Sequence, residues 1–541
     1  MTHGQCLEGW NRRTFLKGMG LLGALTFSDL ACLSQGAPAA AAATQPTRFV
    51  YAWTAFDLLD PHVKYDGNAY FFNLNMYDNL LRYQGNPPEI VPWLAERYDV
   101  TEGGRTWTFH LRRGVQFHDG NEVNAEAVRF SFERLLTLGK GPAGVFKRMG
   151  LTPERVQAID THTVQIQLAQ PYGPFRAAIP IVSIVNPAVI TAQAENGDWA
   201  EKWLVRNEAG SGAYALVKYD PATGFVMQRF PGYWRGWQAK YMDEVEIRLM
   251  RETSSRVLAL MKGDIHTADT NFPPDQLEKL EKSPRLKVSA YNSMAPCYIK
   301  MHNLREPFTD IHVRKALSYA FNYESFIHDI LKGRATRNPG PMPQSLWGYP
   351  RELEGYSYDL EKAKAHLAQA QVKITRPLEI HVQSEFEQTV QAALLLQSDL
   401  AKLGIELRVV KSLFPTIVAS AKSPETSPDM WIHWVSTYYV DPENWLGDIY
   451  DSANWGTWKS SCFYKNSRVD ELLQQARSHV EQEERAKFYE EACRLITEDA
   501  PDIWVYTRLE HPPLAKNVQG FAFCPVGTGR DFWPLYFDAQ A

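Results

Sequence analysis

The sequence is poor in cysteine, carries no excess of positive charge and lacks the short motifs of common hydrolases. Its 541 residues include six cysteines, none spaced as Cys-x-x-Cys, so the pattern indicates neither a redox centre nor a metal site. The net charge of −5 at pH 7 provides no basic surface for nucleic acid. Neither Gly-x-Ser-x-Gly nor His-Glu-x-x-His occurs, which argues against a serine hydrolase or a zinc protease. We therefore expect no catalysis, no metal, no cofactor and no nucleic-acid partner.

The first residues have the pattern of an export leader. Asn11-Arg12-Arg13-Thr14-Phe15-Leu16-Lys17 resembles the twin-arginine signal, which exports proteins that are already folded. Residues 18–33 are too short and too mixed to span a bilayer, and the small residues 37–43 predict cleavage near Ala43. A lipid anchor at Cys32 is disfavoured, because Asp29 stands where such sites carry an apolar residue. We predict a mature protein that is periplasmic, soluble and monomeric.

Beyond the leader, the composition favours large cores and more than one folding unit. The chain is 45% hydrophobic and 12% aromatic. Alternating apolar residues predict strands, and apolar residues at helical spacing predict helices, with Asn124 as a cap and Gly263 and Gly404 as stops. The predicted strands lie around 107–111, 245–249 and 405–409, and the predicted helices around 128–136, 257–261, 313–321 and 390–403. Repeated helix–glycine–strand units indicate α/β lobes.

Five segments follow one another in a recognisable order. They are Leu94-Ala95-Glu96-Arg97-Tyr98 with Phe117-His118-Asp119-Gly120, then Gly210-Ser211-Gly212-Ala213-Tyr214, then Ala259-Leu260-Met261-Lys262-Gly263-Asp264-Ile265, then Pro307-Phe308 with Val313-Arg314-Lys315-Ala316-Leu317, and finally Tyr358-Asp359 with Asp441-Pro442. In this order, behind an export leader, they resemble the family of extracytoplasmic solute-binding proteins that serve peptide-type ABC importers.

The resemblance implies an α/β fold of the two-lobed periplasmic binding protein type (type II, similar to cluster C), with a hinge between the lobes. An extra subdomain is expected in the first lobe, and the ligand is expected in the cleft between the lobes. The implied parts are a signal peptide at 1–43, a first lobe from 44–83, 185–290 and 508–541, an inserted subdomain at 84–184 and a second lobe at 291–507. The chain would cross between the lobes near 287–291 and 506–511.

An aromatic segment of the second lobe carries most of the candidate ligand contacts. In the family, a tryptophan-containing segment precedes an Asp-Pro pair, and here residues 430–442 read Met-Trp-Ile-His-Trp-Val-Ser-Thr-Tyr-Tyr-Val-Asp-Pro. Rings here could stack on a ligand, and extended backbone could pair with a peptide. The candidates are Trp431, His433, Trp434, Tyr438 and Tyr439, with core packing as the open alternative for the two tryptophans. In the first lobe, the resemblance adds Phe56 and Asp57.

Two positions depart from the dipeptide binders of the family. Those proteins hold the ligand's ammonium with an aspartate where this chain has Tyr438, and its carboxylate with an arginine where this chain has Gln383. A buried charge without a counter-charge is costly, so a free dipeptide is disfavoured. Longer peptides, opines, oligosaccharides and other polar solutes stay open. Glu443 and Asp448, expected on the wider surface, could serve a cationic ligand, but solvated roles are favoured.

The resemblance therefore implies the substrate-binding component of an ABC importer. Such a protein captures a peptide-like or other polar organic solute and delivers it to permease subunits in the inner membrane. Two alternatives stay open. One is an exported enzyme that loads a cofactor before export, and the other is a binding protein that reports to a chemoreceptor.

Overall fold

Two mixed sheets organise the part of the chain that the computed structural model describes, which is residues 47–54, 56, 58–384 and 386–538. The predicted export leader and Asp57 lie outside these residues. Within them, no helix has both the length and the apolar character that a membrane crossing requires.

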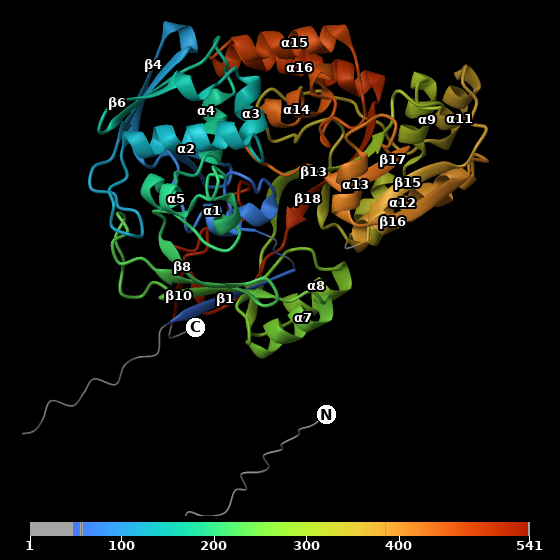
Figure 1. Cartoon of the computed structure of the whole chain (residues 1–541). Helices are drawn as coiled ribbons and strands as arrows, with labels where there is room; N and C mark the ends of the chain where they lie inside the picture. Colours follow the sequence, from blue (N-terminus) through green and yellow to red (C-terminus); the bar gives the residue numbers. More distant parts are fainter. Residues whose placement is uncertain (1–46, 55, 57, 385, 539–541) are drawn as a thin grey trace, which may run out of the picture. The chain divides into compact units, whose positions relative to one another are not determined.

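The first lobe is built on a seven-stranded sheet whose central strand is buried on both faces (Figure 1). On strand β1, Phe49 and Tyr51 pack in one core with Phe71, while Val50 and Ala52 pack against helices α7 and α8. In order, the strands are β12 (Leu286–Val288), β19 (Pro513–Ala515), β11 (Thr267–Ala268), β1 (Arg48–Trp53), β10 (Glu244–Leu249), β9 (Gly224–Arg229) and β8 (Tyr214–Asp220). The helices near it are α1 (Tyr70–Asn73), α5 (Pro187–Gln193), α6 (Glu201–Leu204), α7 (Thr253–Lys262) and α8 (Pro274–Glu281).

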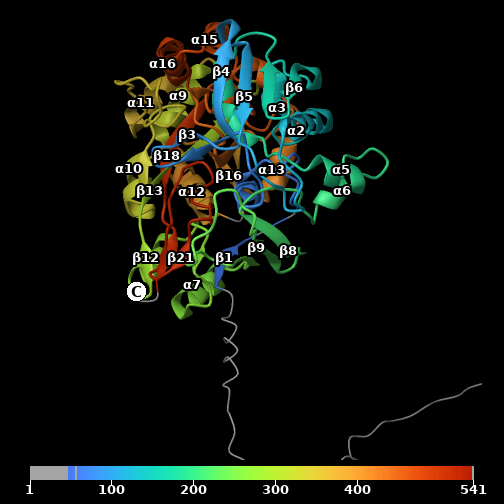
Figure 2. The ribbon, with the colours of Figure 1, turned by 90° about the vertical axis from the view of Figure 1, so that its left-hand side faces the viewer.

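A four-stranded antiparallel sheet lies between β1 and β8 in the chain. Its strand β5 alternates Trp107, Phe109 and Leu111 into a core that it shares with α2, as the sequence predicts. Figures 1 and 2 both place this sheet near α15 and α16. The strands are β4 (Ala95–Thr101), β5 (Thr106–Leu111), β7 (Thr163–Gln167) and β6 (Val156–Asp160), and the helices are α2 (Ala125–Leu138), α3 (Ala143–Arg148) and α4 (Phe175–Ala178). A separate hairpin joins β2 (Leu81–Gln84) to β3 (Glu89–Pro92).

The second lobe is built on a six-stranded sheet. The predicted helix at 390–403 is α12, which ends two residues earlier, and Gly404 follows with a φ of 74°. The strands in order are β14 (Ala335–Arg337), β18 (Asp502–Glu510), β13 (Tyr291–Met301), β17 (Met430–Trp434), β15 (Leu378–Gln383) and β16 (Leu407–Ser412). The helices are α9 (Ile311–Ala320), α10 (Tyr323–Ser325), α11 (Leu360–Gln369), α12 (Glu387–Ala401), α13 (Phe414–Ser420), α14 (Gly447–Tyr450), α15 (Ser467–Ser478) and α16 (Gln482–Asp499).

The chain passes between the two large sheets at two places. It leaves the seven-stranded sheet after Val288 and enters the six-stranded sheet at Tyr291. It returns between Glu510 and Pro513. A short ladder of β20 (Val518–Gln519) and β21 (Tyr536–Phe537) follows the return. Two adjacent crossings are what a hinge between lobes needs, although the exact domain boundaries stay a prediction.

Two features of the sequence, a glycine-rich stretch and the cysteines, could suggest a cofactor site or a disulfide. Gly139, Gly141 and Gly144 have the Gly-x-Gly-x-x-Gly spacing of a dinucleotide site, but they follow a helix and not a strand, which is the wrong context for that site. The four cysteines after residue 46 are free thiols, three of them buried. Neither feature provides a cofactor site or a disulfide.

Asn124 gives a direct test of the local folding rules. Its side-chain oxygen accepts a hydrogen bond from the Ala127 N–H at 3.0 Å and caps α2. Asn124→Ala should lower the free energy of unfolding by about 1 kcal/mol, measured by urea unfolding. Asn124→Asp keeps the acceptor and is the control. Equal losses in the two variants would contradict the capping role.

Candidate ligand site between the lobes

A cavity of about 40 Å³ has walls from both lobes, and we call it the tyrosine cavity. The first lobe contributes Tyr65, Tyr70 and Tyr83, and the second lobe contributes Tyr438. The rings of Tyr65 and Tyr438 lie 4.5 Å apart between centroids. The Tyr70 hydroxyl donates to the Thr437 carbonyl at 3.1 Å. Tyr438 therefore lies in the wall of this cavity, at the surface that the second lobe turns toward the first, and its contact with a ligand stays a prediction.

The tyrosine cavity also contains polar atoms whose hydrogen-bonding capacity is unused. The Tyr65 hydroxyl, the Asn73 side-chain oxygen and the Arg82 Nε are buried and have no hydrogen-bond partner among the described residues. Buried polar groups are normally paired, because an unpaired one costs roughly 1–3 kcal/mol. These three atoms belong to residues that line the cavity, but each has almost no exposed surface in this form, so a polar ligand can reach them only when the wall rearranges.

A second cavity of about 40 Å³ lies near the chain crossings and contains Trp434. The indole N–H of Trp434 donates to the Tyr506 hydroxyl at 2.9 Å, which leaves the ring face half-buried in the wall. The Arg508 guanidinium lies 5.5 Å from the Trp434 ring centroid and donates to the Asn271 side chain at 2.6 Å. Asn271 belongs to the first lobe, so this cavity also joins the two lobes.

Three other candidates, Trp431, His433 and Tyr439, are buried and line neither cavity. Trp431 is 1% exposed and donates to the Ser461 hydroxyl at 3.0 Å. His433 stacks on Trp431 at 4.2 Å, and burial holds its pKa well below the usual range. Tyr439 is 1% exposed within the core of the inserted region. As ligand contacts, these residues stay predictions.

Gln383 and Phe56 also have structural partners. The buried Gln383 amide donates to the Ile432 carbonyl at 3.0 Å. Phe56 packs edge to face on Phe71 and Phe225 in the first lobe. The Gln383 amide is used within the second lobe and provides no cation for a ligand carboxylate.

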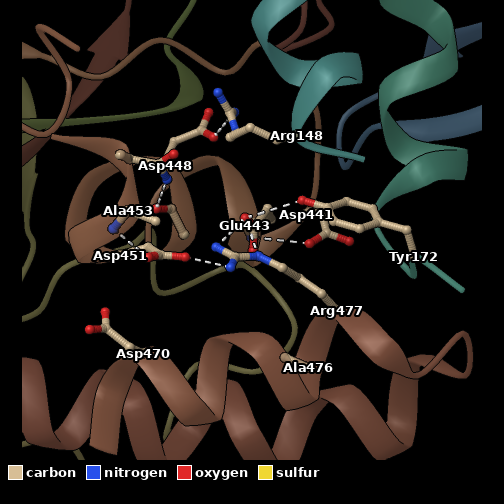
Figure 3. Close-up of polar contacts among 12 residues, drawn as sticks. Arg148, Tyr172, Asp441, Glu443, Asp448, Asp451, Ala453, Asp470, Ala476 and Arg477 are labelled. Atoms are coloured by element: carbon tan, nitrogen blue, oxygen red, sulfur yellow. Dashed lines mark hydrogen bonds and ion pairs between the residues drawn. The ribbon is translucent and has the colours of Figure 1, made fainter. Parts of the chain in front are cut away.

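The segment after Tyr438 leads into a buried group of charges, which corrects the expectation for Glu443 and Asp448. They are 1% and 3% exposed and are paired with cations (Figure 3). We call Asp441, Glu443, Asp448 and Asp451 the carboxylate cluster. Asp441 accepts from Arg485 at 2.7 Å, Glu443 from Arg477 at 2.8 Å and Asp448 from Lys459 at 2.8 Å. Asp451 pairs with Arg477 as well. The prediction of solvated carboxylates was wrong, because each acid is paired with a cation from another segment of the chain.

The first lobe contacts this cluster at three points. Arg148, the last residue of α3, forms an ion pair with Asp448. The Tyr172 hydroxyl lies 3.5 Å from the Glu443 carboxylate, and the Gly173 N–H donates to the Arg477 carbonyl at 2.8 Å. Figure 3 shows Arg148 and Tyr172 approaching the cluster from separate segments. No sequence motif predicts these contacts, because they join residues about 300 positions apart in the chain.

Burial changes the protonation of Glu443. Loss of solvent, opposed by Arg477 and assisted by the charges of Asp448 and Asp441, raises the pKa of Glu443 to about 7. The neighbouring phenols of Tyr172 and Tyr489 face the same carboxyl group. Glu443 is therefore the acid of the carboxylate cluster that titrates near neutral pH.

Comparison with known proteins shows which family of proteins this chain resembles. Residues 89–457 match the bacterial extracellular solute-binding proteins, family 5 Middle. A probable D,D-dipeptide-binding periplasmic protein of Escherichia coli is 31% identical, over 86% of this chain and 90% of its own length.

Two solved structures show the same fold. The periplasmic binding protein DppA of Helicobacter pylori, associated with an ABC transporter and in complex with the peptide STSA, is 26% identical with a TM-score of 0.80, over 91% of this chain and 98% of that one. The oligopeptide-binding protein AppA of Bacillus subtilis, with a nonapeptide, is 22% identical with a TM-score of 0.81, over 91% and 100%. Both confirm the two-lobed α/β architecture.

The titration of Glu443 predicts how stability depends on pH. Because its folded pKa is raised from 4.5 to about 7, its contribution to stability is full below about pH 4.5 and is lost as the pH rises through 7. Relative to Glu443→Gln, the free energy of unfolding of the natural protein should fall by up to about 3 kcal/mol over this window. Urea unfolding at a series of pH values measures it, with the exposed Glu484→Gln as control. Parallel profiles for the natural protein and Glu443→Gln would rule out the raised pKa.

Proposed function

Because the chain belongs to the bacterial extracellular solute-binding proteins of family 5, we propose that it is the substrate-binding component of an ABC importer. It captures a peptide-like or other polar solute between its lobes and delivers it to membrane permease subunits. The observation that supports this most is the tyrosine cavity, whose walls come from both lobes. A ligand that contacts both walls binds the closed form better than the open form, and so it shifts the population toward closure.

The charges at the tyrosine cavity bear on the class of ligand. Asp66 pairs with Lys64 at 2.8 Å, and the Arg82 guanidinium donates to the Leu74 carbonyl at 2.9 Å while it stacks on Trp93. Each charged side chain of the described wall thus already has a counter-charge, since Arg82 also lies 3.7 Å from the Asp531 carboxylate, although its Nε donates to no acceptor among the described residues. A ligand held here through neutral hydrogen bonds and aromatic contact avoids the desolvation of an unpaired terminus. On charge alone, longer or blocked peptides and neutral polar solutes suit these walls better than a free dipeptide, and at about 40 Å³ the tyrosine cavity can hold only part of such a ligand in this form.

We further propose that residues 1–43 export the folded protein to the periplasm by the twin-arginine route. The arginine pair at 12–13 and the small residues at 37–43 support this proposal. An importer's binding protein needs to meet its solute outside the inner membrane. The importer function also leaves no role for a cofactor loaded before export.

The export proposal predicts where a variant of the leader accumulates. Arg12→Lys combined with Arg13→Lys should keep the full-length chain in the cytoplasm, measured by cell fractionation and immunoblotting. Lys17→Arg in the same leader is the control. A double variant that reaches the periplasm at the normal level would show that another route is used.

The ligand proposal is tested on the solute that co-purifies with the protein. Mass spectrometry identifies it, and calorimetry measures its dissociation constant. Tyr438→Ala should weaken binding roughly ten- to a hundredfold, since a buried aromatic contact contributes on the order of 1–3 kcal/mol. Tyr438→Phe keeps the ring and is the control. An unchanged dissociation constant for Tyr438→Ala would remove Tyr438 from the site.

A second measurement concerns dipeptides. Calorimetry with Ala-Ala should show a dissociation constant weaker than about 100 μM, because neither terminus finds a free counter-charge at the tyrosine cavity. Micromolar or tighter binding of Ala-Ala would contradict the argument drawn from Tyr438 and Gln383.

A further inference from the structure

The carboxylate cluster has one more acid than the second lobe has cations to pair with it. Its four acids, Asp441, Glu443, Asp448 and Asp451, are each less than 10% exposed. The cations that the second lobe places in contact with them are Lys459, Arg477 and Arg485. Among the described residues, four carboxylates against three cations leave one negative charge without a counter-charge when all four acids are ionised, which for Glu443 means a pH above about 7. In a buried setting such a charge is strongly destabilising.

The first lobe provides the fourth cation. Arg148 forms an ion pair with Asp448, whose carboxylate also accepts from Lys459 at 2.8 Å. The Arg148 side chain is 32% exposed and that of Asp448 is 4% exposed. The arginine thus enters the edge of the cluster from solvent, and the charge of the cluster is balanced only while the two lobes touch.

We propose that Arg148 is a latch residue, which sets the lifetime of the closed form by completing the charge balance of the carboxylate cluster. This inference rests on the proposed function, because only a protein that opens and closes around a ligand needs a latch. Arg148 is a positioning residue and touches no ligand itself. Opening the lobes separates it from Asp448 and leaves that carboxylate with Lys459 as its remaining cation.

The latch is linked to the tyrosine cavity through one lysine. The Lys459 ammonium lies 4.5 Å from the Tyr438 ring centroid and also donates to Asp448. A ligand that shifts Tyr438 therefore acts on the same lysine that shares Asp448 with Arg148. This path of three contacts, from Tyr438 through Lys459 and Asp448 to Arg148, connects ligand contact to the strength of the latch.

Two backbone amides donate hydrogen bonds across the lobe boundary, and their exchange measures the opening of the latch in protein without ligand. The Gly173 N–H donates to the Arg477 carbonyl at 2.8 Å, and the Val440 N–H donates to the Tyr83 hydroxyl at 3.0 Å. Both amides exchange with solvent deuterium only when these contacts open. Hydrogen exchange with mass spectrometry on the purified full chain therefore measures opening directly.

The experiment compares Arg148→Met with two other variants. Arg148→Met should speed exchange at Gly173 and Val440 roughly fivefold, as expected for a partly exposed ion pair. Arg148→Lys keeps the positive charge and should restore most of the protection. Arg129→Met is the matched control, because Arg129 pairs with Glu126 and Glu133 inside α2 and crosses no lobe boundary.

Each outcome decides the question. Faster exchange at Gly173 and Val440 in Arg148→Met alone, with unchanged exchange in strand β5, supports the latch. Unchanged exchange at both amides overturns it, and so does faster exchange throughout β5, which would mean that Arg148 supports the fold instead. Failure of the latch leaves the binding function untouched, since the co-purifying solute and the Tyr438 variants test that function separately.

Discussion

Four carboxylates are buried beside the segment that faces the ligand, and when all four are ionised, above the raised pKa of Glu443, they need four cations. This requirement ties the two lobes together. The second lobe brings Lys459, Arg477 and Arg485, and the first lobe brings Arg148. Polar contacts at Tyr172 and Gly173 lie next to that pair. The charge balance thus depends on a contact that hinge motion makes and breaks. Closure of the lobes therefore forms an ion pair as well as packing contacts.

The same segment connects this contact to the ligand. Tyr438 forms part of the wall of the tyrosine cavity, and Glu443 and Asp448 come shortly after it in the chain. A solute held between Tyr438 and the first lobe therefore acts within a few residues of the ion pairs that keep the lobes together. In such a molecule, binding of the solute and closure of the lobes are one process. A transport protein that must present a closed form to its permease needs this coupling.

Local elements were readable from the sequence, and long-range partners were not. The strand with Trp107 and Phe109 and the cap at Asn124 follow from side-chain period and hydrogen-bonding capacity, which depend on neighbours in the chain. Arg314, for example, donates to the backbone carbonyls of Phe308 and Asp499, and no sequence pattern indicates these partners. Glu443 and Asp448 look like surface acids until residues from distant segments surround them. Tyr438 was predicted as a ligand contact only because the resemblance marked its position, and no motif pointed to the tyrosines of the first lobe that line the same cavity.

The central claim is that a solute draws the two lobes together. Small-angle X-ray scattering tests it on protein stripped of its solute by unfolding and refolding, and then reloaded with the solute that mass spectrometry identifies. The account predicts a smaller radius of gyration on reloading, and a smaller decrease for Arg148→Met at equal occupancy. An identical radius of gyration with and without saturating solute would contradict it.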